Sequence, residues 1–489
     1  MNQHNLSPAD PCDRTLFAEH LFYRSGGASL MRDNRVRYLK DSRENYPAWQ
    51  DALADASHFI CIEMYIISMD DFGRKIRDIL LNRLAAGVEV YLIYDWFGCL
   101  PAWACRFFAP LQHAGAQLLA YNKPSLTNGV GLLSRNHRKS IIVDGRVAFV
   151  SGLCMSSRWE GNAARGIAPW RDSGLMIEGA AVAEILAAFA DTWNAAGRTL
   201  PENIRSLPSA AGEVSLRVIA TTPHNNNMMR LDLTAISAAR ETVWITDAYF
   251  MPSRMYTQAL INAAQDGVDV RILVPRTSDI RWIGTVSRTQ YRTLLEAGVR
   301  VFEWNGSMIH AKTSIVDGIW ARVGSTNLNV SSWFANRELD IVIEGDAGVN
   351  ELEKHFLWDL SQSTEVVLDA NHAARLKEKR QLLRNKSSNR HTQAAARQIA
   401  YLTSAIDTVL RGEIAGVDKP EMWSYLSIFV VAAMLALLVF FVPAVVVFPV
   451  TVLLVIGAVA SALHALQLYT RARRKRPAND SGHPNTDVH

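Results

Sequence analysis

The sequence predicts an α/β protein made of two similar halves that share one site, followed by a C-terminal pair of membrane-spanning helices. Three observations support this prediction. A His-x-Lys-x4-Asp signature occurs twice, with the copies 173 residues apart. The strand and helix patterns around the two copies repeat, and a long uncharged stretch lies near the C-terminus. The duplicated signature comprises His137, Lys139, Asp144, His310, Lys312 and Asp317.

The chain begins with an N-terminal segment at residues 1–33. Its first part, Met1–Thr15, is polar and contains no apolar signal region. The first half is expected at residues 34–205 and the second at 206–365. A repeat of this length has the size of a domain and is too long for a solenoid unit.

Within each half, short apolar strands alternate with helical stretches and glycines. Ala86–Val90 matches Asp266–Val270, and Ala114–Leu118 matches Ala297–Val301. Such alternation predicts helices layered around a largely buried sheet, and the short apolar strands are consistent with that burial. The two signatures run into further predicted strands at Ser140–Val143 and Thr313–Val316.

Residues 366–422 are expected to form a basic helical linker. Apolar residues recur at helical spacing over Ile399–Leu410. This pattern predicts an amphipathic helix that docks on the protein body or lies at a membrane surface.

A transmembrane hairpin is predicted at residues 423–470, which contain no Asp, Glu, Lys or Arg. Ser424–Val442 has 19 residues and Val450–Tyr469 has 20, and each is long enough to cross the hydrocarbon layer of about 30 Å. Pro443 and Pro449 bracket the turn. Because this turn is itself apolar, a re-entrant hairpin is the alternative.

Lysine and arginine flank the hairpin on both sides, in the linker and in the basic tail at residues 471–489. Positive residues accumulate on the cytoplasmic side of membrane spans. We therefore expect the protein body in the cytoplasm. The same residues would attract anionic lipid headgroups.

Composition argues against several other classes. A net charge of +4 does not by itself indicate a nucleic-acid partner. The odd number of cysteines and their lack of C-x-x-C spacing argue against a disulfide framework or a zinc site. No cluster of carboxylates and histidines with metal spacing accompanies the signatures, so we expect a mechanism without a metal ion or other cofactor. The cysteines are Cys12, Cys61, Cys99, Cys105 and Cys154.

The paired signatures suit chemistry on a phosphodiester. Lysine supplies a fixed positive charge for phosphate oxygens, and Ser325 and Asn327 add neutral donors. One histidine can attack as a neutral nucleophile, while the other, protonated, gives a proton to the leaving oxygen. This division of labour predicts a covalent phosphohistidine intermediate.

These residues resemble the phospholipase D superfamily, and within it the bacterial cardiolipin synthases. The resemblance covers about Tyr38 to Leu360. It implies two phospholipase D-like halves related by a pseudo-twofold axis and a phosphatidyltransferase that uses phospholipids, with phosphatidylglycerol as the expected substrate. Together with the predicted hairpin, it points to a multi-pass protein of the bacterial inner membrane, although familiar cardiolipin synthases carry their spans N-terminally. No nucleic-acid partner is expected, because the core lacks a dense basic stripe with interleaved aromatic residues. Besides the signatures, the resemblance rests on Asn136–Val150, Gly324–Leu328, Ala248–Pro252, Gly267–Pro275 and Trp170–Asp172.

The resemblance also implies roles for individual residues. His137 would be the nucleophile and His310 the general acid. Glu338 would orient a signature imidazole, with Asp172 as its counterpart in the first half. The signature aspartates, Asp144 and Asp317, are part of the predicted catalytic signature but are expected to be turn and packing residues. The phosphate would be held by Lys139, Lys312, Ser325 and Asn327.

The chain departs from the family pattern at Cys154, where an asparagine is usual, and at Ser151, where a glycine is usual. The phosphate cradle is therefore expected to be asymmetric. Three alternatives stay open: transfer to another alcohol or to water, a membrane-tethered nuclease, and a non-catalytic membrane scaffold.

Overall fold

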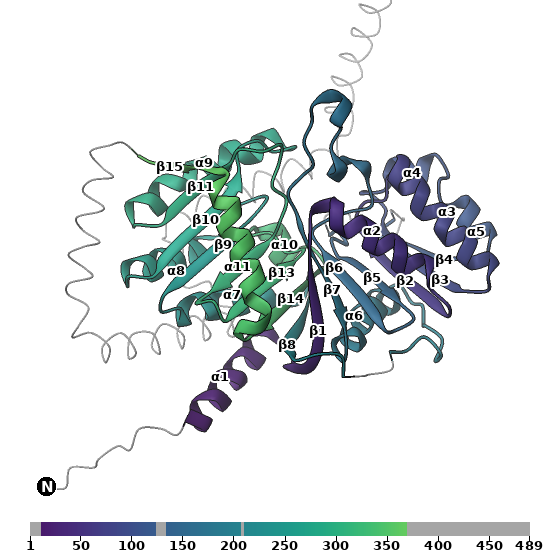
Figure 1. Ribbon diagram of the computed structural model, residues 1–489, viewed down its shortest axis with the longest axis horizontal. Helices are drawn as coiled ribbons and strands as arrows, with labels where there is room; N and C mark the ends of the chain where they lie inside the picture. Colours follow the sequence, from purple (N-terminus) through teal and green to yellow (C-terminus); the bar gives the residue numbers. More distant parts are fainter. Residues whose placement is uncertain (1–10, 124–133, 207–209, 369–489) are drawn as a thin grey trace, which may run out of the picture. The chain divides into compact units, whose positions relative to one another are not determined.

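Fifteen strands of the described residues form one continuous hydrogen-bonded sheet that runs through both halves (Figure 1). The structure is a computed structural model that describes residues 11–123, 134–206 and 210–368. The predicted α/β architecture is confirmed, since helices cover this sheet in both halves.

An N-terminal helix, α1 (Pro11–Gly26), packs against helix α7 (Asn227–Ala238) of the second half and precedes the first half. The elements of the first half are β1 (Met31–Lys40), α2 (Asp41–Ala54), β2 (Phe59–Met64), α3 (Asp71–Ala85), β3 (Glu89–Asp95), α4 (Leu100–Ala104), α5 (Ala109–His113), β4 (Gln117–Tyr121), β5 (Lys139–Val143), β6 (Val147–Ser151), the short 3₁₀ turns η2 (Ser157–Glu160) and η3 (Ala163–Arg165), β7 (Ser173–Glu178) and α6 (Ala181–Ala195).

The second half repeats this succession. Its elements are β8 (Val214–Thr221), α7 (Asn227–Ala238), β9 (Thr242–Thr246), α8 (Arg254–Gln265), β10 (Asp269–Pro275), α9 (Arg281–Glu296), β11 (Arg300–Trp304), β12 (Thr313–Val316), β13 (Trp320–Gly324), α10 (Val330–Phe334), β14 (Glu338–Glu344), α11 (Asp346–Ser361) and β15 (Ser363–Val366).

The strand order shows that the halves correspond. Outward from the centre, the first half reads β1-β7-β6-β5-β2-β3-β4 and the second reads β8-β14-β13-β12-β9-β10-β11, with β15 at the edge. β1 and β8 pair antiparallel where the halves meet. Corresponding strands therefore occupy mirrored places in the order, as a pseudo-twofold relation requires.

Each half mixes parallel and antiparallel pairing. β2, β3 and β4 are parallel, and the helices between them provide the crossover connections that parallel neighbours need. β5, β6 and β7 are antiparallel. A short turn at residues 144–146 joins β5 to β6, and so short a connection allows only antiparallel pairing. Each signature lysine lies at the start, or just before the start, of the first antiparallel strand, next to the carboxyl end of a parallel one.

Three apolar clusters hold these layers together. One lies between the halves and joins residues of α6 and α11 with strand residues such as Ile177 and Ile341. The other two lie on the outer faces, beneath α2 and α3 in the first half and beneath α7 and α8 in the second. Burial of apolar surface stabilises all three clusters, and the central one holds the halves together.

Local signals account for where helices start beside the sheet. The Asp70 carboxylate accepts a hydrogen bond from the Gly73 amide at the start of α3, and the Ser253 hydroxyl accepts one from the Tyr256 amide in α8. Such caps satisfy amides that have no partner within the helix.

Within residues 11–368, apart from the two short gaps, no helix is both long and apolar enough to cross a bilayer. The predicted hairpin at 423–470, the tail at 471–489 and all but the first residues of the linker lie outside the described residues.

Candidate active site

His137 lies just before β5 and is held by the second half. Its backbone amide donates to the carbonyl of Arg337 at 2.9 Å, and its Nδ1 lies 2.8 Å from Oε2 of Glu338. The preceding Asn136 is fixed within the first half: its amide donates to Asp95 at 2.9 Å. The imidazole is therefore fixed from both halves at once.

His310 lies in the loop before β12 and is held by the first half. Its amide donates to the carbonyl of Arg171 at 2.7 Å, and its Nδ1 lies 2.8 Å from Oδ2 of Asp172. The indole of Trp159 donates to the same carboxylate oxygen at 2.8 Å.

The two histidine–carboxylate pairs are thus exchanged between the halves. Glu338 of the second half binds His137, and Asp172 of the first half binds His310. Neither half alone contains a complete pair. The sequence predicted these carboxylates as orienting groups but did not predict which imidazole each one binds.

Both signature lysines are buried beside the imidazoles. Nζ of Lys312 lies 3.0 Å from Nε2 of His310, and Nζ of Lys139 donates to the carbonyl of His137 at 2.5 Å. Burial lowers the pKa of Lys139, and it lowers the pKa of Lys312 to about 8. The two ammonium groups lie beside the two orienting carboxylates, Asp172 and Glu338, so these four groups carry no net charge when all are ionised.

The imidazoles have a reduced affinity for protons. Burial lowers the pKa of His137, with a smaller opposing effect from Glu338. Burial and then the nearby Lys312 lower the pKa of His310 to about 4. Lys139 acts on His310 and Lys312 acts on His137, so the two sets lie close enough to form one electrostatic unit.

The orienting carboxylates stay ionised beside the two lysines. Burial by itself raises the pKa of Asp172, but His310 and Lys312 outweigh it, and the pKa lies below its usual value. The pKa of Glu338 is lowered against the effect of burial, chiefly by His137. Each carboxylate can therefore accept a hydrogen bond from Nδ1–H of its imidazole, which leaves Nε2 free for a substrate.

The Ser325 hydroxyl, predicted to hold the phosphate, binds an orienting carboxylate in this structure. It donates to Glu338 at 2.6 Å and accepts from the Leu339 amide at 2.9 Å. A hydroxyl has one proton to give, so this group steadies the carboxylate. Asn327 is buried. Its Nδ2 group can donate to a phosphate oxygen, so Asn327 remains the candidate amide at the phosphate.

The signature aspartates lie just after the C-terminal ends of β5 and β12, whereas the imidazoles lie just before the N-terminal ends of these strands. Asp144 has φ +53° in the turn after β5 and accepts from the amides of Ser57, His58 and Phe59 at 2.7–2.9 Å. Asp317, with φ +50° after β12, accepts from three consecutive amides at residues 240–242 in the same way. Both aspartates join a turn to the start of a neighbouring strand.

Two aromatic residues at the site have no place in the signature. The ring of Tyr65 lies 4.9 Å from that of His137, and the ring of Tyr249 lies 5.7 Å from that of His310. Both tyrosines follow the strand that precedes their half's helix α3 or α8. The sequence analysis did not single out these tyrosines as site residues. Their matching positions, just after the corresponding strands β2 and β9, could have identified them.

Cys154 lies where the second half has Asn327. The thiol is buried, and burial raises its pKa even though Lys139 acts in the opposite direction. The two halves of the phosphate site are therefore asymmetric, as expected: the first half places a neutral thiol near Lys139, where the second half has the amide of Asn327. Among the described residues, no group of three or more His, Cys, Asp or Glu is arranged to hold a metal ion.

Comparison with known proteins decides the family. The profile described as "Cardiolipin synthase, PLD-like domain" matches residues 233–360. A cardiolipin synthase of Alkalihalophilus pseudofirmus is 32% identical over 75% of this chain and 73% of its own length. The chain belongs to the cardiolipin synthase family of the phospholipase D superfamily.

Another family member, cardiolipin synthase A of Pseudomonas aeruginosa, is 32% identical over 71% of each chain. Among solved structures, the phosphatidylserine synthase of Haemophilus influenzae covers 76% of this chain and 98% of its own, with a TM-score of 0.56 and 14% identity. At that identity the likeness shows a shared fold. This cardiolipin synthase family member therefore shares its fold with the phosphatidylserine synthase.

Proposed function

We propose that this enzyme is a phosphatidyltransferase that moves a phosphatidyl group from one phospholipid to a hydroxyl of another, giving cardiolipin from two molecules of phosphatidylglycerol. The observation that carries the proposal is the exchanged pair of histidine–carboxylate contacts. It sets two imidazoles with fixed tautomers beside two ammonium groups.

In the first step, Nε2 of His137 attacks the phosphorus of phosphatidylglycerol, an N–P bond forms and the bond from phosphorus to the glycerol oxygen breaks. The leaving oxygen takes the proton from Nε2 of His310, and glycerol departs. In the second step, the hydroxyl of another phosphatidylglycerol gives its proton back to His310. Its oxygen then bonds to phosphorus, the N–P bond breaks, and cardiolipin leaves.

The assignment of nucleophile and acid follows from the lysine contacts. No hydrogen bond from a described residue reaches Nε2 of His137, so that lone pair is available for attack. Nε2 of His310 lies beside the Lys312 ammonium, which can supply the proton that the acid delivers. A bound phosphodiester anion also raises both imidazole pKa values and so favours uptake of that proton.

Apolar side chains at the rim support a lipid substrate. Phe97 is 54% exposed and lies two residues after Asp95, which binds the neighbour of His137. Ile280 is 37% exposed and follows Asp279, which accepts from the hydroxyl of Tyr249. Exposed apolar groups beside a phosphate site suit a substrate with a charged headgroup and acyl chains.

We further propose that the protein is a multi-pass protein of the bacterial inner membrane, with the hairpin at residues 423–470 as its anchor and its catalytic halves in the cytoplasm. The uncharged sequence and its basic flanks support this topology. An anchor of this kind would keep the site beside its lipid. The same site residues would serve another alcohol or water as acceptor, so acceptor choice needs a direct test.

The test is lipid analysis by mass spectrometry in a host that lacks its own cardiolipin synthases, with His137→Ala as the control. Cardiolipin that appears only with the intact histidine supports the proposal. Phosphatidic acid alone would redirect it to hydrolysis, and a different headgroup would redirect it to another acceptor alcohol. Cardiolipin formed equally by the variant would overturn the mechanism.

A further inference from the structure

Each orienting carboxylate follows an arginine whose role the signature does not explain. Arg171 precedes Asp172, and Arg337 precedes Glu338. Their backbones pair in parallel with the opposite half, through isolated bridges of Arg171 with Ile309 and of Arg337 with Asn136. Each arginine thus pairs with the residue just before a signature histidine, and the acid that follows the arginine binds that same histidine.

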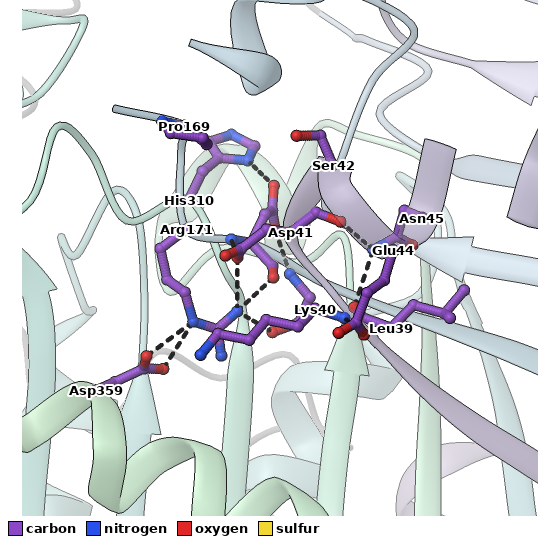
Figure 2. Close-up of polar contacts among 12 residues, drawn as sticks. Leu39, Lys40, Asp41, Ser42, Glu44, Asn45, Pro169, Arg171, His310 and Asp359 are labelled. Carbon is purple, nitrogen blue, oxygen red and sulfur yellow. Dashed lines mark hydrogen bonds and ion pairs between the residues drawn. The ribbon is translucent and has the colours of Figure 1, made fainter. Parts of the chain in front are cut away.

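The side chains of these arginines bind the last long helix of the opposite half. Nε of Arg171 lies 2.8 and 3.0 Å from the two carboxylate oxygens of Asp359 on α11 (Figure 2). Nη1 of Arg337 binds Asp191 on α6. We call Arg171 with Asp359 the first clasp and Arg337 with Asp191 the second clasp.

Each Arg–acid dipeptide therefore contacts the opposite half at two points. Arg171 and Asp172 of the first half bind α11 and His310 of the second half. Arg337 and Glu338 of the second half bind α6 and His137 of the first half. An orienting carboxylate can therefore move relative to its imidazole only if the ion pair of the preceding arginine also breaks.

The two clasps differ in strength. Arg171 also donates to the Tyr38 hydroxyl at 2.9 Å and to Asp41 at 3.2 Å, and Asp359 is 3% exposed. Asp191, in contrast, is 54% exposed. Exposed ion pairs contribute little, whereas breaking a buried pair is costly. The carboxylate of His310 is therefore held more rigidly than that of His137.

From these contacts we infer that Arg171 and Arg337 are positioning residues, each of which holds one orienting carboxylate, and through it one imidazole, in register with the opposite half. Neither arginine needs to touch the substrate. The inference rests on the proposed function, because the two imidazoles must have different tasks for the two clasps to have separable effects.

The test uses the full-length protein and the pH dependence of kcat for glycerol release from phosphatidylglycerol. The variants are Arg171→Lys and Asp359→Asn in the first clasp and Asp191→Asn in the second. Asp191→Asn changes an exposed side chain and is expected to fold. The control, Arg217→Lys, weakens the 2.5 Å ion pair with Glu344, at the opposite end of β14 from Glu338.

We expect kcat to fall by up to about 10²-fold in the clasp variants with little change in KM, the scale of an ångström-level misplacement. Each carboxylate raises the pKa of its imidazole, so a loosened carboxylate lets that pKa fall. His310 must be protonated, so in the first-clasp variants the loss of kcat at high pH (the basic limb of the pH profile) begins at a lower pH. His137 must be neutral, so in Asp191→Asn the loss of kcat at low pH (the acidic limb) begins at a lower pH.

Arg217→Lys should lower thermal stability and leave both limbs in place. If all three clasp variants keep the wild-type kcat profile and lose only stability, as the control does, the inference is wrong. Failure of the proposed function would look different, since the wild-type protein would then release glycerol and form phosphatidic acid without cardiolipin. An Arg171→Lys and Asp359→Asn double variant should be no worse than the more impaired single variant, because the pair acts as a unit.

Discussion

At the scale of single residues, the site consists of two similar sets whose environments differ. Nδ1 of each imidazole is hydrogen-bonded to a buried carboxylate. Only His310, however, has the lysine of its own signature, Lys312, at 3.0 Å from Nε2. One set also contains Asn327 where the other contains Cys154. Such differences let a duplicated site divide attack and protonation between its halves.

This division predicts different behaviour for the two histidine variants on a phosphodiester with a p-nitrophenol leaving group, which departs without an acid. The His310→Ala variant should lose about 10²–10⁴-fold in kcat on phosphatidylglycerol, the usual contribution of a general acid, but keep a rapid burst of p-nitrophenol. The His137→Ala variant should show no burst. A burst in His137→Ala alone would reverse the two roles.

Lys312 predicts a pH dependence for substrate capture. Burial holds its pKa at about 8, so the ammonium is present below that pH and is lost as the pH rises through it. The value of kcat/KM, which reports groups of the free enzyme, should therefore fall above pH 8 by about tenfold per unit. Lys312→Arg, whose charge persists, should flatten this decline. An unchanged decline in Lys312→Arg would assign it to another group.

At the scale of secondary-structure elements, the strand ends explain which signature residues can act. β5 and β12 each carry a lysine at or near one end and an aspartate just beyond the other. The sequence predicted both strands and the structural role of the aspartates. The antiparallel pairing of β5, β6 and β7 was not predicted, because the strands were recognised by their composition, whereas pairing direction depends on the connections between them.

The turn aspartates lead to a prediction about stability. Asp144→Ala removes an acceptor shared by the amides of Ser57, His58 and Phe59. Hydrogen bonds to charged groups contribute about 1.5–3 kcal/mol each, but these contacts are partly exposed and water can replace them. We therefore expect the free energy of unfolding to fall by about 2–4 kcal/mol in total. The kcat of the folded protein should stay close to that of the wild type, since the turn is distant from the imidazoles. Chemical denaturation and initial rates measure the two effects. A large loss of kcat in a fully folded variant would give the aspartate a direct role.

At the scale of the whole molecule, the repeat in the sequence predicted two halves and one site, but not the exchange of carboxylates between them. Glu338 and Asp172 could be recognised as orienting groups from their place in the pattern. Their partners could not be assigned, because each pair joins residues more than 130 positions apart across the boundary between the halves. The arginine clasps were missed for the same reason: Arg171 and Asp359 are 188 residues apart.

The apolar rim predicts how the assembled molecule meets its substrate. Phe97 and Ile280 come from different halves, yet both follow strands whose ends lie beside the imidazoles. Insertion of such side chains into the headgroup region strengthens membrane binding in proportion to the apolar area buried. At their exposure, each side chain would contribute about 1 kcal/mol to the free energy of binding.

Phe97→Ser and Ile280→Ser should therefore each reduce kcat/KM about fivefold when full-length protein acts on phosphatidylglycerol vesicles. With short-chain phosphatidylglycerol dispersed as monomers, their rates should match the wild type. The control is Ile319→Ser, because Ile319 is 58% exposed but lies beside Asp317, at the end of the sheet away from the imidazoles. Since all three variants replace one exposed apolar side chain, only contact between the rim and the lipid surface would separate them. Equal losses in all three, or losses on monomers as well, would show that the rim does not meet the bilayer.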